Sequence, residues 1–345
     1  MSDALISARD VWKVYGPNPI GAISGDPTPE ALQASGHIAA VRDVSFDIPR
    51  GEMLVVMGLS GSGKSTLVRC LSRLVEITAG SVTVDGADIG ALSDRELIAL
   101  RREKMGMVFQ NFALLPNRTV LENVAFPLEM RGQDMTSRRA RAAEMVRLVG
   151  LDEREDYFPR ELSGGQQQRV GIARSLAIEP DIWFLDEPFS ALDPLIRRDM
   201  QDEFLRLQAM LGKPIVFITH DFDEALRLAD RIAIMKDGAV EQIDTPDRIV
   251  LHPATSYIGR FTEDIDKARV VRAGSLARPL NGTVPQGSPV PADATLRDLA
   301  RRLAEDPSEY LSVADGSGAL IGVLARAAAL DLLFGPAPAL AEAAE

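Results

Sequence analysis

The stretch MLVVMGLSGSGKST, residues 53–66, decides the fold of this chain. Its first five residues are apolar and predict a buried strand, and residues 58–66 contain the phosphate-loop pattern GxxxxGK[ST]. A helical pattern over residues 64–74 follows directly. Because glycines let backbone N–H groups surround a polyphosphate at a helix N-terminus, this strand–loop–helix order predicts a nucleotide-binding site.

The side chains of this loop suggest separate tasks. Lys64 can reach the β- and γ-phosphates of a nucleotide, and the Ser65 hydroxyl can ligate Mg²⁺. A chance Gly/Ser loop is the alternative, but the flanking strand and helix argue against it. The other nucleotide-binding candidates in the loop are Gly58, Ser60, Gly61, Ser62, Gly63 and Thr66.

A second acidic motif supports this reading. In IWFLDE, residues 182–187, four apolar residues precede two acids, as in a buried strand that ends at a site. Asp186 would orient Mg²⁺ through water, and Glu187 would position and polarise the attacking water. A solvated acidic loop is the alternative reading of this motif alone. Together with the phosphate loop, the motif predicts nucleotide hydrolysis.

A second glycine-containing helix start lies in LSGGQQQR, residues 162–169. Such a helix start can bind an anion. One nucleotide does not need two phosphate-binding loops, so we expect this one to meet a nucleotide held by another copy of the chain. A plain serine-capped helix is the alternative.

Composition excludes several classes of protein. The 345 residues include 38 Lys and Arg against 50 Asp and Glu, and this net charge of −12 argues against a nucleic-acid binder. One cysteine, Cys70, and three histidines argue against a disulfide framework and a zinc site. The sequence shows no signal peptide and no membrane-length apolar run. We expect a cytoplasmic protein that meets the membrane only through partners.

The order of apolar runs predicts the domain organisation. Short strands alternate with helices up to about residue 263, which indicates an α/β domain with a largely parallel sheet. A Gly- and Pro-rich insertion is expected at 16–37 and a linker at 264–287. A small α+β unit is expected at 288–334, followed by a disordered tail at 335–345.

Together these motifs make the chain resemble the ATP-binding subunits of ABC transporters over about residues 5–260. The resemblance implies ATP hydrolysis on a RecA-like P-loop NTPase core, with an inserted helical subdomain at about 110–179. It also implies that two subunits sandwich two ATP molecules head to tail. Ser163, Gly164 and Gly165 would then contact the γ-phosphate held by the opposite subunit.

The same resemblance assigns four further residues. Gln110 matches the Q-loop glutamine that senses Mg²⁺ and couples to the membrane subunit, and Asp193 in SALD lies at the dimer seam. His220 matches the switch histidine beside the γ-phosphate. Tyr15 matches an aromatic residue that stacks on adenine. Two alternatives are that Trp12 takes this role in a shifted register, or that Tyr15 is a core residue.

The 16–37 insertion, the FALLP segment and the C-terminal extension resemble the ATPases of glycine betaine, proline and choline importers. This implies a homodimer on the cytoplasmic side of the inner membrane, bound to an integral membrane permease and, indirectly, to an extracytoplasmic solute-binding protein. No nucleic-acid partner is expected. The ATPase of another ABC importer, or a soluble non-transport ABC ATPase, are the alternatives.

The C-terminal extension has its own resemblance. The segments ADATLRDLARRL and YLSVADGSGALIGVLARAAALDLL, within 288–334, resemble a single CBS motif. This implies sensing of ionic strength or nucleotide. A structural or dimerising appendage is the alternative, and a single copy could pair with its counterpart in the second subunit.

Overall fold

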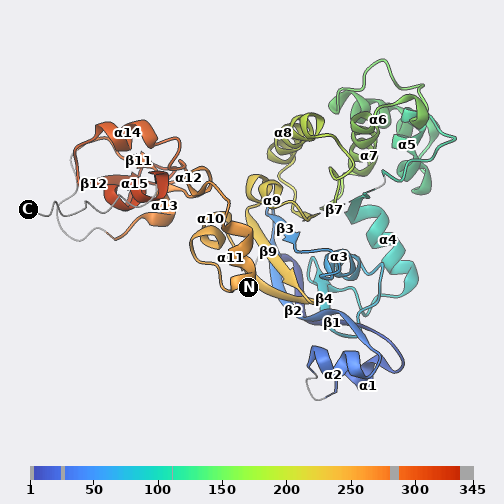
Figure 1. The fold of residues 1–345 in the computed structure, drawn as a ribbon. Helices are drawn as coiled ribbons and strands as arrows, with labels where there is room; N and C mark the ends of the chain where they lie inside the picture. Colours follow the sequence, from blue (N-terminus) through green and yellow to red (C-terminus); the bar gives the residue numbers. More distant parts are fainter. Residues whose placement is uncertain (1–3, 25–27, 111, 280–286, 335–345) are drawn as a thin grey trace, which may run out of the picture. The chain divides into compact units, whose positions relative to one another are not determined.

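The computed structural model describes residues 4–24, 28–110, 112–279 and 287–334. It divides the chain into two compact units, Met1–Ile243 and Asp244–Glu345 (Figure 1). Within the described residues, no helix is both long and apolar enough to cross a membrane.

A six-stranded sheet forms the centre of the first unit, with the order β10-β9-β3-β8-β7-β6. β3 pairs in parallel with β8 and β9, and β7 pairs in parallel with β6 and β8. Parallel strands bring their carboxyl ends to one edge, so the residues that follow β3, β7 and β8 meet there. The bounds are β3 Met53–Met57, β6 Met105–Val108, β7 Ile182–Asp186, β8 Ile215–Thr219, β9 Arg231–Lys236 and β10 Ala239–Asp244.

An antiparallel sheet with the order β2-β1-β4-β5 packs against this centre. Apolar residues of both sheets and of α3 (Lys64–Leu71) share one core, which includes Ile6, Val44 and Leu67. The four strands are β1 Ala4–Tyr15, β2 Ile38–Pro49, β4 Ala79–Val84 and β5 Ala87–Asp88.

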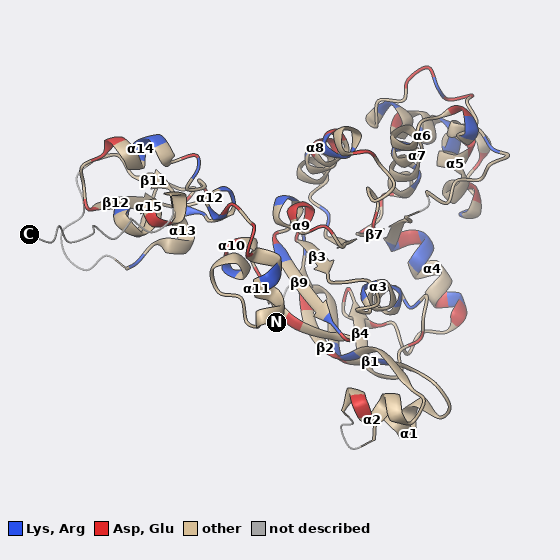
Figure 2. Ribbon diagram, in the orientation of Figure 1, with Lys and Arg blue, Asp and Glu red and all other residues tan. Residues whose placement is uncertain are grey.

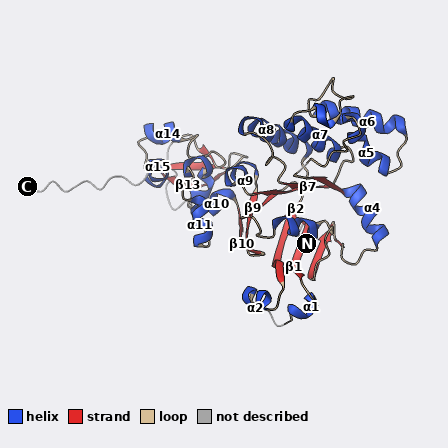
Figure 3. Cartoon of the chain, turned by 45° about the vertical axis from the view of Figure 1, so that its right-hand side comes forward, coloured by secondary structure: helices blue, strands red, loops and turns tan. Residues whose placement is uncertain are grey.

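The insertion after Tyr15 forms two short helices, α1 (Pro19–Ala22) and α2 (Pro29–Ala34). They lie beyond the ends of β1 and β2 in both ribbon views (Figures 1 and 3). Leu32 of α2 is buried, so the segment is anchored to the domain. The backbone of Tyr15 lies opposite Ile38, which brings the two ends of the insertion together.

Aromatic residues cover the other face of the central sheet. The ring of Trp183 on β7 lies 5.4 Å from that of Phe204 on α8 (Pro194–Leu211), and Phe217 on β8 joins the cluster. Ile182 and Phe184, which flank Trp183 on β7, belong to the core on the opposite face, because side chains alternate along a strand. Two more helices flank the sheet, α4 Asp94–Lys104 and α9 Phe222–Leu228.

A group of helices separates β6 from β7 in the sequence: α5 (Val120–Met130), α6 (Met135–Leu148) and α7 (Gly164–Leu176). They pack against one another, and a short 3₁₀ helix at Pro159–Glu161 precedes α7. All lie within residues 110–179, the range expected for the helical subdomain. The buried Asn123 on α5 donates to and accepts from the backbone of Leu115, which fixes the entry to this group.

The second unit has its own core around a sheet of order β11-β12-β13. β11 runs parallel to β12, and β12 runs antiparallel to β13. The elements are α10 Pro246–Leu251, α11 Ser256–Thr262, α12 Lys267–Val270, α13 Ala273–Leu276, β11 Val290–Pro291, α14 Ala300–Glu305, β12 Tyr310–Ala314, β13 Leu320–Ala325 and α15 Arg326–Phe334.

The structure corrects the expected domain boundary and linker. The division falls between Ile243 and Asp244, not after residue 263. Residues 267–276, inside the expected linker of 264–287, form α12 and α13, whose Ala268, Val271 and Ala273 are buried in the second core. Helices of four residues are too short to show a helical period, so the sequence pattern missed them. Residues 280–286 and the expected disordered tail at 335–345 lie outside the described residues.

Candidate active site

A cleft of about 1050 Å³ lies at the carboxyl edge of the central sheet. The phosphate loop and the start of α3 form its floor. Its lining includes Ser60, Gly61, Gly63, Lys64, Ser65 and Thr66 from the loop and helix, together with Gln110, Glu187 and His220 from the ends of β6, β7 and β8.

Two glycines let the phosphate loop lie against neighbouring backbone. Gly58 has φ 150° and Gly63 has φ 101°, both in the region that favours glycine. A Cβ on Gly58 would lie 2.2 Å from the carbonyl oxygen of Met235, and one on Gly63 would lie 2.1 Å from that of Ala40. A side chain at either position would therefore displace the loop.

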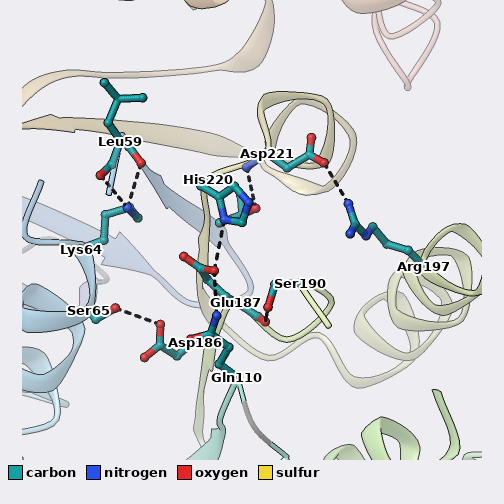
Figure 4. Close-up of polar contacts among 12 residues, drawn as sticks. Leu59, Lys64, Ser65, Gln110, Asp186, Glu187, Ser190, Arg197, His220 and Asp221 are labelled. Carbon is teal, nitrogen blue, oxygen red and sulfur yellow. Dashed lines mark hydrogen bonds and ion pairs between the residues drawn. The ribbon is translucent and has the colours of Figure 1, made fainter. Parts of the chain in front are cut away.

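Lys64 is buried at the start of α3 and is held by the loop itself. Its Nζ donates to the carbonyl oxygens of Gly58 and Leu59 at 2.8 and 3.0 Å (Figure 4). Burial lowers the pKa of this ammonium, and the carboxylates of Glu187 and Asp186 oppose that shift. These contacts place a cation at the mouth of the loop.

Ser65 and Asp186 join the phosphate loop to β7. The Ser65 hydroxyl donates to Oδ1 of Asp186 at 3.1 Å, and burial raises the pKa of that carboxyl (Figure 4). A hydroxyl and a carboxylate are oxygen ligands that suit Mg²⁺, which usually binds few protein groups together with substrate phosphates. Among the described residues, no group of three or more His, Cys, Asp or Glu side chains is arranged to hold a metal ion by itself.

Glu187 is the meeting point of three strand ends. Its Oε2 accepts a hydrogen bond from the Gln110 amide at 3.3 Å and lies 3.1 Å from Nδ1 of His220 (Figure 4). Glu187 has φ 46°, a strained value for a non-glycine residue. Its N–H donates to the Ile218 carbonyl, and its own carbonyl accepts from the Ser190 hydroxyl, so both sides of the strained residue are fixed.

The structure thus gathers Lys64, Ser65, Gln110, Asp186, Glu187 and His220, which sequence analysis named as catalytic or metal-binding candidates. In this arrangement the Gln110 amide contacts Glu187 and not the Ser65–Asp186 pair.

The residues expected to act on a second subunit lie elsewhere. Ser163 caps α7 in a reciprocal arrangement with Gln166, and Asp193 caps α8. Ser163, Gly164 and Asp193 are exposed, Gly165 is buried, and none of the four lines the cleft.

Tyr15 also does not line the cleft. The residue is 44% exposed, and the Lys13 ammonium lies 4.8 Å from the ring centroid. Its backbone partner Ile38 does line the cleft, so Tyr15 is one strand removed from it. The adenine-stacking role stays a prediction.

Sequence analysis missed one wall of the cleft. Pro29, Glu30, Gln33 and His37, all in the insertion, line it. The available signal was position, because the insertion begins directly after Tyr15, where an adenine contact was expected. Ile38, Ala39 and Ala40 of β2, Leu59 of the phosphate loop, and Asp237 and Gly238 of the β9–β10 turn were also missed.

Comparison with known proteins agrees with this geometry. A family model described as ABC transporter matches residues 41–190, which include the phosphate loop and Glu187. The ATP-binding protein TmoW of the trimethylamine N-oxide transport system of Ruegeria pomeroyi is 69% identical over 337 residues, covering 97% of this chain and 98% of TmoW. The chain belongs to the ATP-binding subunits of ABC transporters. As an ABC ATPase it binds and hydrolyses ATP, as predicted.

Other relatives of this ABC ATPase include ProV of Escherichia coli, a glycine betaine/proline betaine transport ATP-binding protein. It is 49% identical over 277 residues, covering 79% of this chain and 69% of ProV. Among solved structures, a dimeric ATP-binding cassette in a post-hydrolysis state with ADP and Pi has a TM-score of 0.59 at 36% identity, covering 70% of this chain and 98% of that chain. The P-loop α/β fold is therefore confirmed, whereas the CBS-like motif stays a prediction.

Proposed function

We propose that this ABC ATPase energises the import of trimethylamine N-oxide, with glycine betaine as the second candidate solute. The observation that carries the proposal is the 69% identity to TmoW of Ruegeria pomeroyi over nearly the whole of both chains. The glycine betaine relatives are 49% identical over 79% of this chain. Sequence analysis pointed to glycine betaine, proline betaine or choline, and the relatives favour another small trimethylated solute.

The cleft suggests how the chain handles ATP and Mg²⁺. The N–H groups of residues 58–66 and the Lys64 ammonium would surround the phosphates, and Ser65 and Asp186 would hold Mg²⁺. The metal supplies charge neutralisation on the phosphoryl group. The groups are placed before the reaction starts, so little reorganisation is needed.

Glu187 would act on the attacking water. Its two described side-chain contacts, with Gln110 and His220, both use Oε2. Among the described residues Oε1 has no such contact, which leaves an oxygen that can accept a proton from water. Gln110 and His220 would orient this carboxylate, and His220, which is 60% exposed, could also reach the γ-phosphate.

A second copy of the chain would complete each site. The N-termini of α7 and α8 lie close together, since a Cβ on Gly165 would be 2.7 Å from Cγ2 of Ile196. Leu195 and Ile196 are 78% and 40% exposed beside the exposed Ser163 and Gly164. Apolar exposure at a helix N-terminus that can bind an anion suits a seam between two subunits, with Ser163, Gly164, Gly165 and Asp193 facing the partner's ATP.

The permease would bind near the end of β6. Phe112, Leu114 and Leu115 follow Gln110 and are partly exposed. The Arg174 guanidinium on α7 donates to the carbonyl oxygens of Phe112 and Ala113, which ties this segment to the helix expected to reach the partner's ATP. A permease contact here would hold the chain at the cytoplasmic face of the membrane, where a solute-binding protein would act only indirectly.

The test is solute uptake by vesicles that contain the chain, its permease and its solute-binding protein. We expect ATP-dependent uptake of labelled trimethylamine N-oxide, weaker uptake of glycine betaine, and none of either solute with Lys64→Ala. Uptake of choline or proline betaine but not of trimethylamine N-oxide would overturn the solute assignment. ATP hydrolysis without uptake of any of these solutes would overturn the proposed transport role.

A further inference from the structure

The insertion between β1 and β2 supplies a wall of the nucleotide cleft that no ATPase motif accounts for. Pro29, Glu30 and Gln33 of α2, together with His37, line the same cleft as Lys64 and Glu187. The family model begins at residue 41, after this segment. The insertion lies outside the residues that the family model matches, so its chemistry is considered separately.

The backbone of this wall is held by a helix cap, a buried leucine and a histidine contact. Thr28 caps α2, with its hydroxyl accepting from the Ala31 N–H at 3.2 Å, and Leu32 is buried. Glu30 and Gln33 are three residues apart and so lie on one face of the helix. The His37 ring lies 2.9 Å from the Ser35 hydroxyl and 2.6 Å from the Pro17 carbonyl oxygen, which closes the segment on itself.

The charge of the insertion decides which part of a nucleotide it fits. Residues 16–37 contain Asp26 and Glu30 but no Lys or Arg. Figure 2 shows the acidic colour on α2 and no basic colour. Hydrogen bonds from the backbone N–H of Glu30 and the Thr28 hydroxyl lower the pKa of the Glu30 carboxyl, so it is ionised at neutral pH. A carboxylate repels a triphosphate but accepts hydrogen bonds from hydroxyl and amino groups.

The position of α2 agrees with this choice. The phosphate loop and Glu187 form the part of the cleft at the carboxyl edge of the central sheet. In Figures 1 and 3, β1 and β2 lie between α2 and β7, the strand that leads to Glu187. A nucleotide whose phosphates occupy the loop would extend its ribose and base away from β7, toward Ile38 and α2.

We propose that α2 closes the nucleoside end of the cleft and binds the ribose hydroxyls or the base amino group through Glu30 and Gln33. This inference rests on the proposed assignment of residues 58–66 to the ATP phosphates. The Glu30 carboxylate and the Gln33 amide oxygen accept hydrogen bonds from the nucleoside. The insertion thereby adds nucleoside recognition to a site in which Lys64 and Ser65 are assigned to the phosphates and Mg²⁺.

Binding measurements on the full chain test the proposal. Calorimetric titration would compare ATP with tripolyphosphate, which has no nucleoside, for the parent chain, Glu30→Ala, Glu30→Gln and Gln33→Ala. We expect Glu30→Ala to weaken ATP binding about tenfold, the loss that corresponds to one charge-assisted hydrogen bond, with tripolyphosphate binding unchanged. The double variant Glu30→Ala/Ala31→Glu keeps the net charge but moves the carboxylate off the lining, and it should stay weakened.

Two nucleotide analogues identify the donor group. If Glu30 binds the ribose hydroxyls, 2′,3′-dideoxy-ATP should bind the parent and Glu30→Ala with equal affinity. If Glu30 binds the base amino group, inosine triphosphate should bind the two proteins with equal affinity. Equal ATP affinity in the parent, Glu30→Ala and Gln33→Ala would overturn the inference, as would equal losses for ATP and tripolyphosphate. Lys64→Ala checks the phosphate assignment separately. The parent should bind tripolyphosphate more tightly than Lys64→Ala, and equal affinities would overturn the assignment of residues 58–66 to the phosphates.

Discussion

The helices α3 and α7 both begin at glycine-rich loops, yet their N-termini are capped differently. α3 starts after Gly63 and has no side-chain cap, so its first N–H groups face the cleft without a partner side chain. α7 starts after Ser163, which exchanges capping hydrogen bonds with Gln166 on the exposed surface. One terminus is therefore prepared for a ligand within its own chain. The other, as proposed, would become a site only when a second molecule covers it.

The largest effect is expected at the cleft of α3. Glu187→Gln keeps the size of the side chain but removes the carboxylate that would accept a proton from water. We expect turnover to fall about a thousandfold while ATP affinity changes little. Steady-state phosphate release and ATP titration check this, and a variant that turns over ATP at close to the parental rate would remove Glu187 from the mechanism.

The matching change at α7 should separate binding from turnover. Gly164→Asp places a carboxylate where the γ-phosphate of the partner's ATP is expected, and like charges about 4 Å apart repel by about 4 kcal/mol near a protein surface. A Cβ here lies 3.6 Å from Leu192, so the variant should fold. We expect the monomer to bind ATP as before. Dimer-dependent turnover should fall about a hundredfold. Normal turnover would show that α7 does not face a partner's ATP.

One substitution made at both termini should affect stability in opposite ways. Gly63→Ala forces an alanine to φ 101° with a Cβ 2.1 Å from a carbonyl oxygen, which should cost about 2 kcal/mol or more. In Gly164→Ala the new Cβ makes only an ordinary van der Waals contact. This variant should raise the free energy of unfolding by less than about 1 kcal/mol. Urea unfolding can be followed by tryptophan fluorescence, because Trp12 and Trp183 both lie in the first unit. Equal costs at the two glycines would contradict the comparison.

The smallest effect is expected from removing the second unit. A chain that ends at Asp244 keeps β10 and every residue of the cleft, so its ATP affinity should stay within about twofold of the parent. A chain that ends at Ile265 is the informative control, because it keeps α10 without the α12 that packs against it and should aggregate more readily. Solute uptake measured at increasing salt concentration, with the full and the shorter chain, would then test whether the CBS-like motif senses ionic strength. Superimposed uptake curves would exclude this role.

The sequence predicted those parts of the fold where a pattern is local and long. The strand expected in IWFLDE, residues 182–187, forms as β7, Ile182–Asp186, because an uninterrupted apolar run ends at an acid. Of the six residues gathered around the cleft, Lys64, Ser65, Asp186 and Glu187 could be named from local motifs, whereas Gln110 and His220 were named by resemblance. Elements of four residues, such as α12, give no period to detect.

Other features were beyond sequence reasoning for physical reasons. No periodicity shows that Glu30 and Gln33 line the same cleft as Lys64, because that placement depends on how the insertion packs along β2. The glycine-containing helix start singled out Ser163 and Gly164, but the assignment of their contact to a γ-phosphate rests on resemblance, since their proposed partner is a second molecule.

The burial of Leu32 has a kinetic consequence. It is the one buried residue among those described in α1 and α2, and burying such a side chain contributes about 1.5–3 kcal/mol. Detaching this wall from β2 would therefore expose little apolar surface and leave the core of the domain intact, with an open population of the order of one molecule in a hundred. We therefore expect this wall to open independently of the central sheet, which would give nucleotide a route of entry and exit that leaves the sheet in place.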